Sequence, residues 1–424
     1  MHYILLSLIA WFIFYNGWMR FMPSLSFYDE FVTIFSLGFL ISNFCLRKIH
    51  LYKKHTTIIV NICVLIFIVI LSIFSKIINQ SPFTNLILFI FNISKIYIII
   101  FAAYFSKINL VKFINDLIFI LKFAFYLSLF FIIIDLSIYG LNVFNMSADW
   151  TGNIFIGAHQ VCSTSLILLL ISTIKILMKK KKNISLSLLY LFVAILAGQW
   201  SIIIIFIPIL LIYLLQLGYL KILQVKWVII STVLFYLFYN IIEYFYSGLI
   251  NATTKFILSI PQIDFWYRIS FSGILDSSFV LFGVGPGMGG SPVAEKYNTP
   301  FFREYFQNIL ESFTWTGSGV FTQPFSSLNT ITSDVGILVY IIITISLIIN
   351  IRIIYKIIIK NKIHPQMLLL APFCILIMIG FSTVIMRSIL LNSYFAGGEP
   401  YAYISCILFG LIYKIDYQRR PSYL

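Results

Sequence analysis

The sequence predicts an all-α polytopic membrane protein. Hydrophobic residues make up 61% of its 424 residues, charged residues make up 10%, and the mean hydropathy is +1.00. Soluble domains are roughly half apolar and a quarter charged. The apolar blocks run for about 16 to 24 residues without alternating at period two, and backbone groups in hydrocarbon must be satisfied within their own segment. Helical spans rather than a barrel are therefore expected.

In chain order, these blocks predict about twelve spans. They lie near 3–22, 29–46, 56–75, 84–105, 117–138, 155–178, 184–200, 202–217, 227–245, 335–352, 366–386 and 400–413. The chain then divides into residues 1–246 with the first nine spans, a long polar loop at 247–334, and residues 335–424 with the last three spans and a tail.

The basic residues predict the orientation of these spans. Lys and Arg gather in every second connector, at 47–54, 107–112, 179–182, 221–226, 352–362 and 414–420. The positive-inside rule then puts both termini in the cytoplasm and the long loop on the outer face. The net charge of +15 is thus mainly a topology signal. Because basic residues are scattered through short turns, nucleic-acid binding is not expected.

No metal or cofactor site is expected either. The cysteines all fall inside apolar segments without ligand spacing, and we interpret them as small apolar residues. They are Cys45, Cys63, Cys162, Cys374 and Cys406.

The long loop carries an arginine preceded by two aromatic residues, Trp266-Tyr267-Arg268. Such aromatics are common at the membrane–water boundary. Alternatively, they stack on a sugar while the planar guanidinium of Arg268 holds phosphate oxygens.

A glycine-rich run, Gly283-Val284-Gly285-Pro286-Gly287, follows Arg268. It does not belong to a βαβ unit, which excludes a dinucleotide fingerprint. Pro286 fixes its own φ, and the glycines permit positive φ and close backbone approach. A chain reversal and a substrate-binding turn are both compatible with this run.

A short amphipathic helix is predicted from Thr299, with Pro300 at its first position. Arg303 and Glu311 share one of its faces. The helix either lies on the membrane surface with solvated charges or turns Arg303 toward a diphosphate.

Three charged positions outside the long loop are also candidates. Lys95 lies within a span and should face the bundle interior or an aqueous cavity, because a charge at bilayer depth is costly. Arg387 lies at an outer helix end, ahead of Tyr394 and Glu399, and is either a snorkelling end residue or functional. The Asp29-Glu30 pair either complements a helix dipole or supplies a catalytic acid.

This layout resembles the family of bacterial polysaccharide polymerases and O-antigen ligases. The resemblance rests on Arg268, on the run Leu281-Phe282-Gly283-Val284-Gly285-Pro286-Gly287, and on a return helix entered near Asp334-Val335-Gly336-Ile337-Leu338. It implies a bundle like those of GT-C glycosyltransferases with one large periplasmic loop. The Ser-Arg that this family often has between two earlier spans is replaced here by Gly198-Gln199-Trp200-Ser201. No histidine lies between His159 and His364, which favours a polymerase over a ligase.

The resemblance implies an inner-membrane glycosyltransferase that moves a growing glycan from undecaprenyl diphosphate onto a lipid-linked oligosaccharide repeat unit, with a chain-length regulator as a protein partner. Arginines would stabilise the developing diphosphate charge without metal or nucleotide. A carboxylate would deprotonate the acceptor hydroxyl. A lipid-linked oligosaccharide flippase and an O-antigen ligase are the alternatives. The catalytic candidates are Arg268, Arg387, Arg303, Glu311 and Asp276, with Asp264 next; the substrate-binding candidates are Trp266, Tyr267, Gly283, Gly285, Gly287, Tyr394, Glu399 and Lys95.

Overall fold

The fold is a bundle of α-helices, given by a computed structural model. It describes residues 1–22, 28–46, 56–140, 155–177, 184–197, 200–219, 279–289, 299–300, 303, 327–360, 365–390 and 400–418. Helices account for nearly all of these residues, and no strand occurs among them. The predicted helical class is therefore confirmed. Among the described helices, five are long and apolar enough to cross a membrane: Thr57–Asn79, Phe83–Phe105, Leu110–Tyr139, Ala158–Leu177 and Ile337–Lys360.

The helices follow the predicted spans closely, except that the span predicted at 227–245 lies outside the described residues. In chain order they are α1 (His2–Ile13), α2 (Tyr15–Phe21), α3 (Tyr28–Cys45), α4 (Thr56–Asn79), α5 (Phe83–Phe105), α6 (Leu110–Tyr139), α7 (Ala158–Leu177), α8 (Ile184–Leu196), α9 (Trp200–Gln216), α13 (Phe279–Phe282), α16 (Ser327–Val335), α17 (Ile337–Lys360), α18 (Pro365–Leu390) and α19 (Pro400–Gln418).

Helix α17 continues to Lys360, past its predicted end at 352, and two further differences have local reasons. The first span is broken at Phe14, and the amide of Gly17 donates to the carbonyl of Phe155 (3.1 Å) instead of continuing the helical ladder. Helix α6 begins at Leu110 rather than 117, because the side chain of Asn109 caps it by accepting from the Lys112 amide (3.1 Å). The prediction missed these turns because Lys112, Asn115 and Asp116 interrupt the apolar run.

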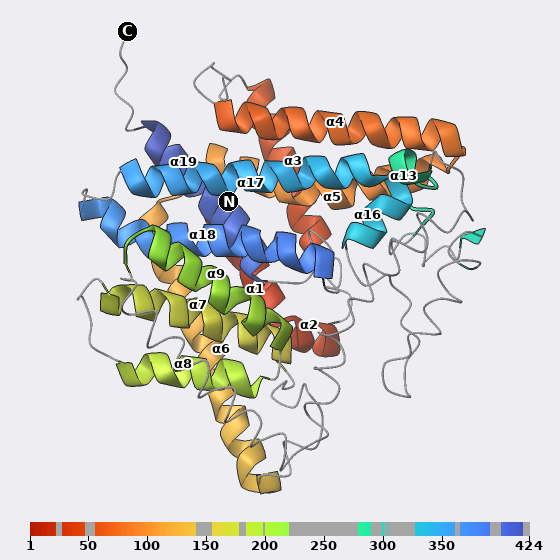
Figure 1. Cartoon of the computed structure of the whole chain (residues 1–424). Helices are drawn as coiled ribbons and strands as arrows, with labels where there is room; N and C mark the ends of the chain where they lie inside the picture. The colour runs from red at the N-terminus through yellow and green to blue at the C-terminus, as the bar shows by residue number, and fades with distance from the viewer. Residues whose placement is uncertain are drawn as a thin grey trace.

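Most helices lie side by side. In Figure 1, α4, α17 and α18 form a row that α9, α7 and α8 continue, and each of these neighbours packs against the next. Helix α5 packs against α19, α3 and α4, and is buried continuously from Ile93 to Tyr104. It is the interior helix of this part of the bundle.

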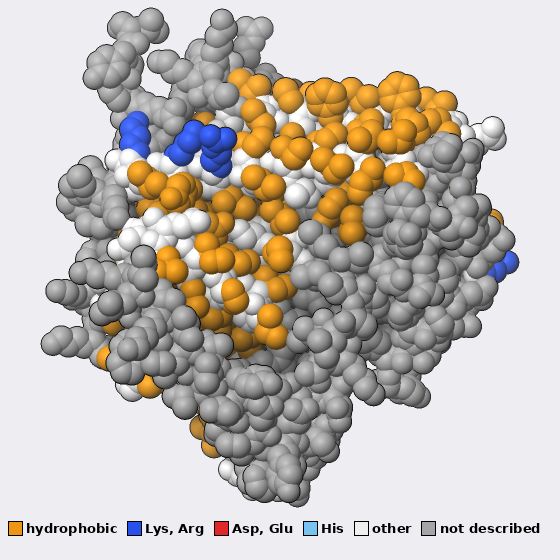
Figure 2. Space-filling view, in the orientation of Figure 1, with side chains coloured by type: hydrophobic (Ala, Val, Ile, Leu, Met, Phe, Trp, Pro, Cys, Tyr) orange, Lys and Arg blue, Asp and Glu red, His pale blue; other side chains and the backbone are white. Residues whose placement is uncertain are grey.

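Helix α4 lies at the margin of the bundle and exposes an apolar face. Figure 2 shows hydrophobic side chains covering it. The face includes Ile66, Phe67, Ile70, Phe74 and Ile77. A face of this kind is unfavourable in water and suits lipid. This agrees with a membrane-embedded bundle.

Different segments of the chain meet at the two ends of the bundle. At one end, His2 pairs with Asp116 (2.8 Å), and Lys414 donates to the carbonyl of Ser106, which joins the chain start, the α5–α6 connector and the end of α19. The α4–α5 turn around Ser81 lies at the other end of α5, about 34 Å away along that helix. That distance spans the hydrocarbon of a typical bilayer.

A buried polar pair joins α4 to α17. Asn61 donates to Asn350 (3.1 Å) and Asn350 donates back (3.2 Å), while Ser346 also donates to Asn61 (2.9 Å). All three side chains are buried. Such reciprocal amide contacts fix the register of two helices.

Replacing Asn350 with leucine should lower the free energy of unfolding by about 1 to 2 kcal/mol, because Asn61 then loses both amide contacts to α17 and keeps only Ser346 and the Thr57 carbonyl. Thermal unfolding of the purified protein in detergent measures this loss. The double variant Asn61→Leu/Asn350→Leu is the control and should recover much of it, since both amides are gone. Strictly additive losses would show that the two residues are not coupled.

Candidate functional site

The glycine-rich run forms a tight turn after α13. Its glycines adopt φ values of +64° at Gly283, +110° at Gly285 and +67° at Gly287. Side chains rarely tolerate this left-handed region, and glycine adopts it without strain. The sequence indicates only that these glycines permit positive φ, and the turn uses that freedom at all three. We call residues 283–289 the glycine loop.

Asp334, at the end of α16, holds the glycine loop through its carboxylate. One oxygen accepts from the Gly287 amide (3.0 Å) and the other accepts from the Gly289 amide (2.8 Å). The carboxylate is fully buried. Successive backbone amides in such turns form a concave anion site, and here a side-chain carboxylate fills it.

The backbone of α16 completes this attachment. The Val284 amide donates to the carbonyl of Ser333 (2.8 Å), and the Gly285 amide donates to that of Asp334 (2.9 Å). These four amides of the glycine loop are therefore already occupied, and a phosphate would have to displace Asp334 to reach those of Gly287 and Gly289. Substrate binding by Gly283, Gly285 and Gly287 stays a prediction.

Side chains from α4 and α5 hold the other side of the glycine loop. Ser75 donates to the carbonyl of Phe282, Asn79 to that of Gly283 (3.2 Å), and Asn85 to that of Gly287 (3.1 Å). The loop is thus tied to the α4–α5 turn as well as to the start of α17. Segments 200 residues apart in sequence meet at this end of the bundle.

Steric constraints explain why glycine is needed here. A Cβ on Gly283 would lie 2.5 Å from the Asp334 carbonyl carbon, and one on Gly285 would lie 2.8 Å from Cβ of Ser81. Gly336, between α16 and α17, has φ +87°, and a Cβ there would lie 1.9 Å from the Leu281 carbonyl oxygen. The backbone approach is therefore too close for any side chain.

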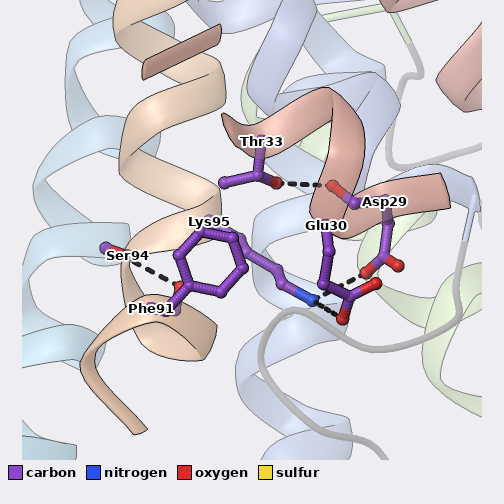
Figure 3. A network of polar contacts seen from close by, with 6 residues as sticks. All are labelled: Asp29, Glu30, Thr33, Phe91, Ser94 and Lys95. Atoms are coloured by element: carbon purple, nitrogen blue, oxygen red, sulfur yellow. Dashed lines mark hydrogen bonds and ion pairs between the residues drawn. The ribbon is translucent and has the colours of Figure 1, made fainter. Parts of the chain in front are cut away.

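A second polar cluster lies inside the bundle and contains Lys95. Its ammonium contacts Oδ2 of Asp29 at 2.8 Å and Oε1 of Glu30 at 2.6 Å. Figure 3 shows the two carboxylates reaching from the first turn of α3 toward Lys95 on α5, with the Phe91 ring beside them. Lys95 is only 5% exposed, so its predicted orientation toward the bundle interior is confirmed. We call Asp29, Glu30 and Lys95 the charge cluster.

Of the other predicted site residues, the structure describes Arg303 fully and Arg387 in its backbone alone. Arg303 is exposed, and its amide donates to the carbonyl of Thr299 (3.0 Å), which has the four-residue spacing of a helical turn; the predicted helix beyond it lies outside the described residues. The Thr299 hydroxyl donates to the carbonyl of Met288 (2.7 Å), so this turn is fastened to the glycine loop. Arg387 lies in the last turn of α18. Outside the described residues lie Arg268, Glu311, Asp276, Asp264, Trp266, Tyr267, Tyr394 and Glu399.

Sequence reasoning missed the residues that anchor the glycine loop. Ser75 and Asn79 are polar residues four apart near the end of an apolar helix, a spacing that puts them on one face. Asp334 immediately precedes the helix that returns from the long loop. The spacing of Ser75 and Asn79 and the position of Asp334 could both have indicated a surface that holds the glycine loop. The partners of Lys95 were also missed, although a lysine at bilayer depth requires a counter-charge.

Changing Asp334 to asparagine should release part of the glycine loop, because the amide side chain keeps one acceptor oxygen and loses the other together with its charge. Hydrogen exchange should speed up at the amides of Gly287 and Gly289. The amide of Val284 is the internal control, since its acceptor is the backbone carbonyl of Ser333. Unchanged protection at all three amides would contradict this attachment.

Two glycine-to-alanine changes should have opposite effects. Gly336→Ala should destabilise the protein by more than about 1 kcal/mol, because the residue has positive φ and the new Cβ clashes with backbone. Gly38→Ala is the matched control: nothing lies within 4 Å of the added Cβ, and alanine is the better helix former. Thermal unfolding of both variants measures the contrast. Similar unfolding temperatures would contradict the close approach at Gly336.

No family model matches this chain, and no curated protein matches it in sequence. Any functional assignment therefore rests on the residues and geometry of the chain itself.

Proposed function

We propose that this protein is a polysaccharide polymerase of the O-antigen type. It transfers a growing glycan from undecaprenyl diphosphate onto a lipid-linked repeat unit at the outer face of the inner membrane. The observation that carries this proposal is the firm attachment of the glycine loop, with the Arg303 turn beside it, to one end of the helical bundle. A soluble loop fixed to the membrane helices gives a polar headgroup and a growing glycan a defined place to meet.

Charge distribution supports the side of the membrane proposed for this loop. Lys107, Lys112 and Lys414 lie at the end of the bundle away from the glycine loop. Helix α17 starts beside the loop and carries its exposed Arg352, Lys356 and Lys360 toward its far end, where Figure 2 shows a group of basic side chains. If the positive-inside rule holds, that end is cytoplasmic and the loop is periplasmic.

The chemistry needs no cofactor from the protein. The glycan donor carries its own activation as a diphosphate leaving group, whose growing negative charge arginines can stabilise. We assign this role to Arg268 and Arg387, with Arg303 next. Glu311 or Asp276 serves as the base that takes the proton of the acceptor hydroxyl.

A flippase is the second candidate, and the charge cluster is the observation that favours it. Transporters place ionisable residues inside the bundle near the middle of the membrane. Lys95, however, is paired with both Asp29 and Glu30 rather than presented to a ligand. The anchored loop therefore supports the polymerase more strongly.

Arg268→Ala should abolish long glycan chains in a strain whose own gene for this protein is deleted. Single lipid-linked repeats should still be exported and capped onto the acceptor. Arg268→Lys should also be impaired, because an ammonium lacks the planar fork that binds two phosphate oxygens. Gel profiles of the surface glycan and immunoblots of membranes measure chain length and protein abundance.

Arg352→Ala is the matched control, because it removes an arginine from the opposite end of the bundle, and it should leave chain length unchanged. Normal chains from Arg268→Ala at normal abundance would refute the catalytic assignment. A deletion strain that retains its repeats on the cytoplasmic leaflet would identify a flippase instead.

A further inference from the structure

The charge cluster contains more negative than positive charge. Two carboxylates, Asp29 and Glu30, surround the single ammonium of Lys95, which lies about 18 Å along α5 from its start. Fully ionised, the three side chains carry a net charge of −1. The amino terminus of α3 offsets about half a charge. The exposed fractions of the side chains are 6% for Lys95, 15% for Asp29 and 33% for Glu30, so solvent screens the remaining charge only in part, and that charge is costly unless something neutralises it.

A second observation concerns Tyr403 in the first turn of α19. Its hydroxyl is buried, the side chain is 1% exposed, and no partner for the hydroxyl occurs within the described ranges. Asp29 and Glu30 act on this hydroxyl electrostatically. Its ring stacks on Phe12 at 4.4 Å, which fixes its position. A buried hydroxyl without a partner is unfavourable, so it marks a place where a further hydrogen-bonding group is expected.

Among the described residues, no second basic side chain contacts the cluster; Arg20 near the end of α2 and Lys76 in the last turn of α4 form no hydrogen bond or ion pair with Asp29 or Glu30. The Tyr15 hydroxyl at the start of α2 also lies within electrostatic reach of both carboxylates, and Tyr28 of α3 bonds to Ser7 of α1 at 2.7 Å. Neither is a cation. The one basic residue of α1, His2, pairs with Asp116 at the opposite end of the bundle. From α5, Lys95 is the only basic residue.

We propose that the charge cluster is a binding site for one proton, held by the Asp29–Glu30 pair. A proton from water adds to a carboxylate oxygen, which turns that carboxylate into a carboxylic acid and brings the three side chains from −1 to neutral. The remaining carboxylate stays ionised and pairs with Lys95. The new acid O–H is a hydrogen-bond donor, and the Tyr403 hydroxyl, on which both carboxylates act electrostatically, has no partner among the described residues.

Infrared spectroscopy of the purified full-length protein in lipid nanodiscs tests this charge count. At neutral pH the wild type should show the carbonyl band of a protonated carboxylic acid, shifted in D₂O. Asp29→Asn and Glu30→Gln should each lose the band, because one carboxylate then balances Lys95. Lys95→Met should double it, because both carboxyls then need a proton. Asp116→Asn, at the opposite end, is the control and should keep the band.

Stability measurements give a second readout. Lys95→Met should unfold at a lower temperature as the pH rises, because two adjacent carboxylates must then ionise together without a counter-charge, and it should approach the wild type at acidic pH. Asp29→Asn should show a flatter pH dependence than the wild type. Absence of the band in the wild type, or its persistence in both carboxylate variants, would overturn the proposal. So would a wild-type band that appears only when sodium and potassium are removed at constant pH, since a metal cation would then be the occupant.

Discussion

The end of the bundle that holds the glycine loop depends on the contacts of the Asp334 carboxylate. This carboxylate receives two amides of the glycine loop, while the backbone carbonyl of the same residue receives a third. Hydrogen bonds to a charged acceptor are about twice as strong as neutral ones. The same residue lies in the last turn of α16, which ends at Val335, and Gly336 then lets α17 begin at once. One side chain therefore joins a polar loop to a membrane helix, and without it the loop would keep only neutral contacts.

The neutral contacts have a different character. Ser75, Asn79 and Asn85 donate to carbonyls of the loop from the ends of α4 and α5. The backbone amides of the loop therefore bond to Asp334 and α16, and its backbone carbonyls bond to side chains of α4 and α5. Few backbone groups of the turn are left for solvent, so the turn is rigid. In the proposed polymerase, a rigid turn would be a suitable support for an arginine that binds a diphosphate with little reorganisation.

The sequence predicted the helices well because their apolar lengths and basic connectors are strong signals. It did not predict the break at Phe14 or the early start of α6, since both depend on contacts of single residues, Gly17 and Asn109. That Gly283, Gly285 and Gly287 could adopt positive φ was predictable from residue type alone. The role of Asp334 was not predictable, because a pattern of glycines does not identify the carboxylate that accepts hydrogen bonds from their amides. Likewise, Lys95 was recognisable as a buried charge, whereas its pairing with Asp29 and Glu30 depends on how α3 packs on α5.

The Asn61–Asn350 pair also limits how this protein can move. Asn350 lies about 21 Å along α17 from Gly336, so the pair sits well inside the bundle while the glycine loop sits at its end. Sliding α17 by one helical turn, about 5.4 Å, would break both amide contacts at once. Small continuous shifts of α17 along α4 are therefore penalised, and the helix has one preferred height. Because Asp334 attaches the glycine loop next to the start of α17, fixing the position of α17 along α4 also fixes the position of the loop. The buried Asn61–Asn350 pair therefore determines how far the loop lies from the centre of the membrane.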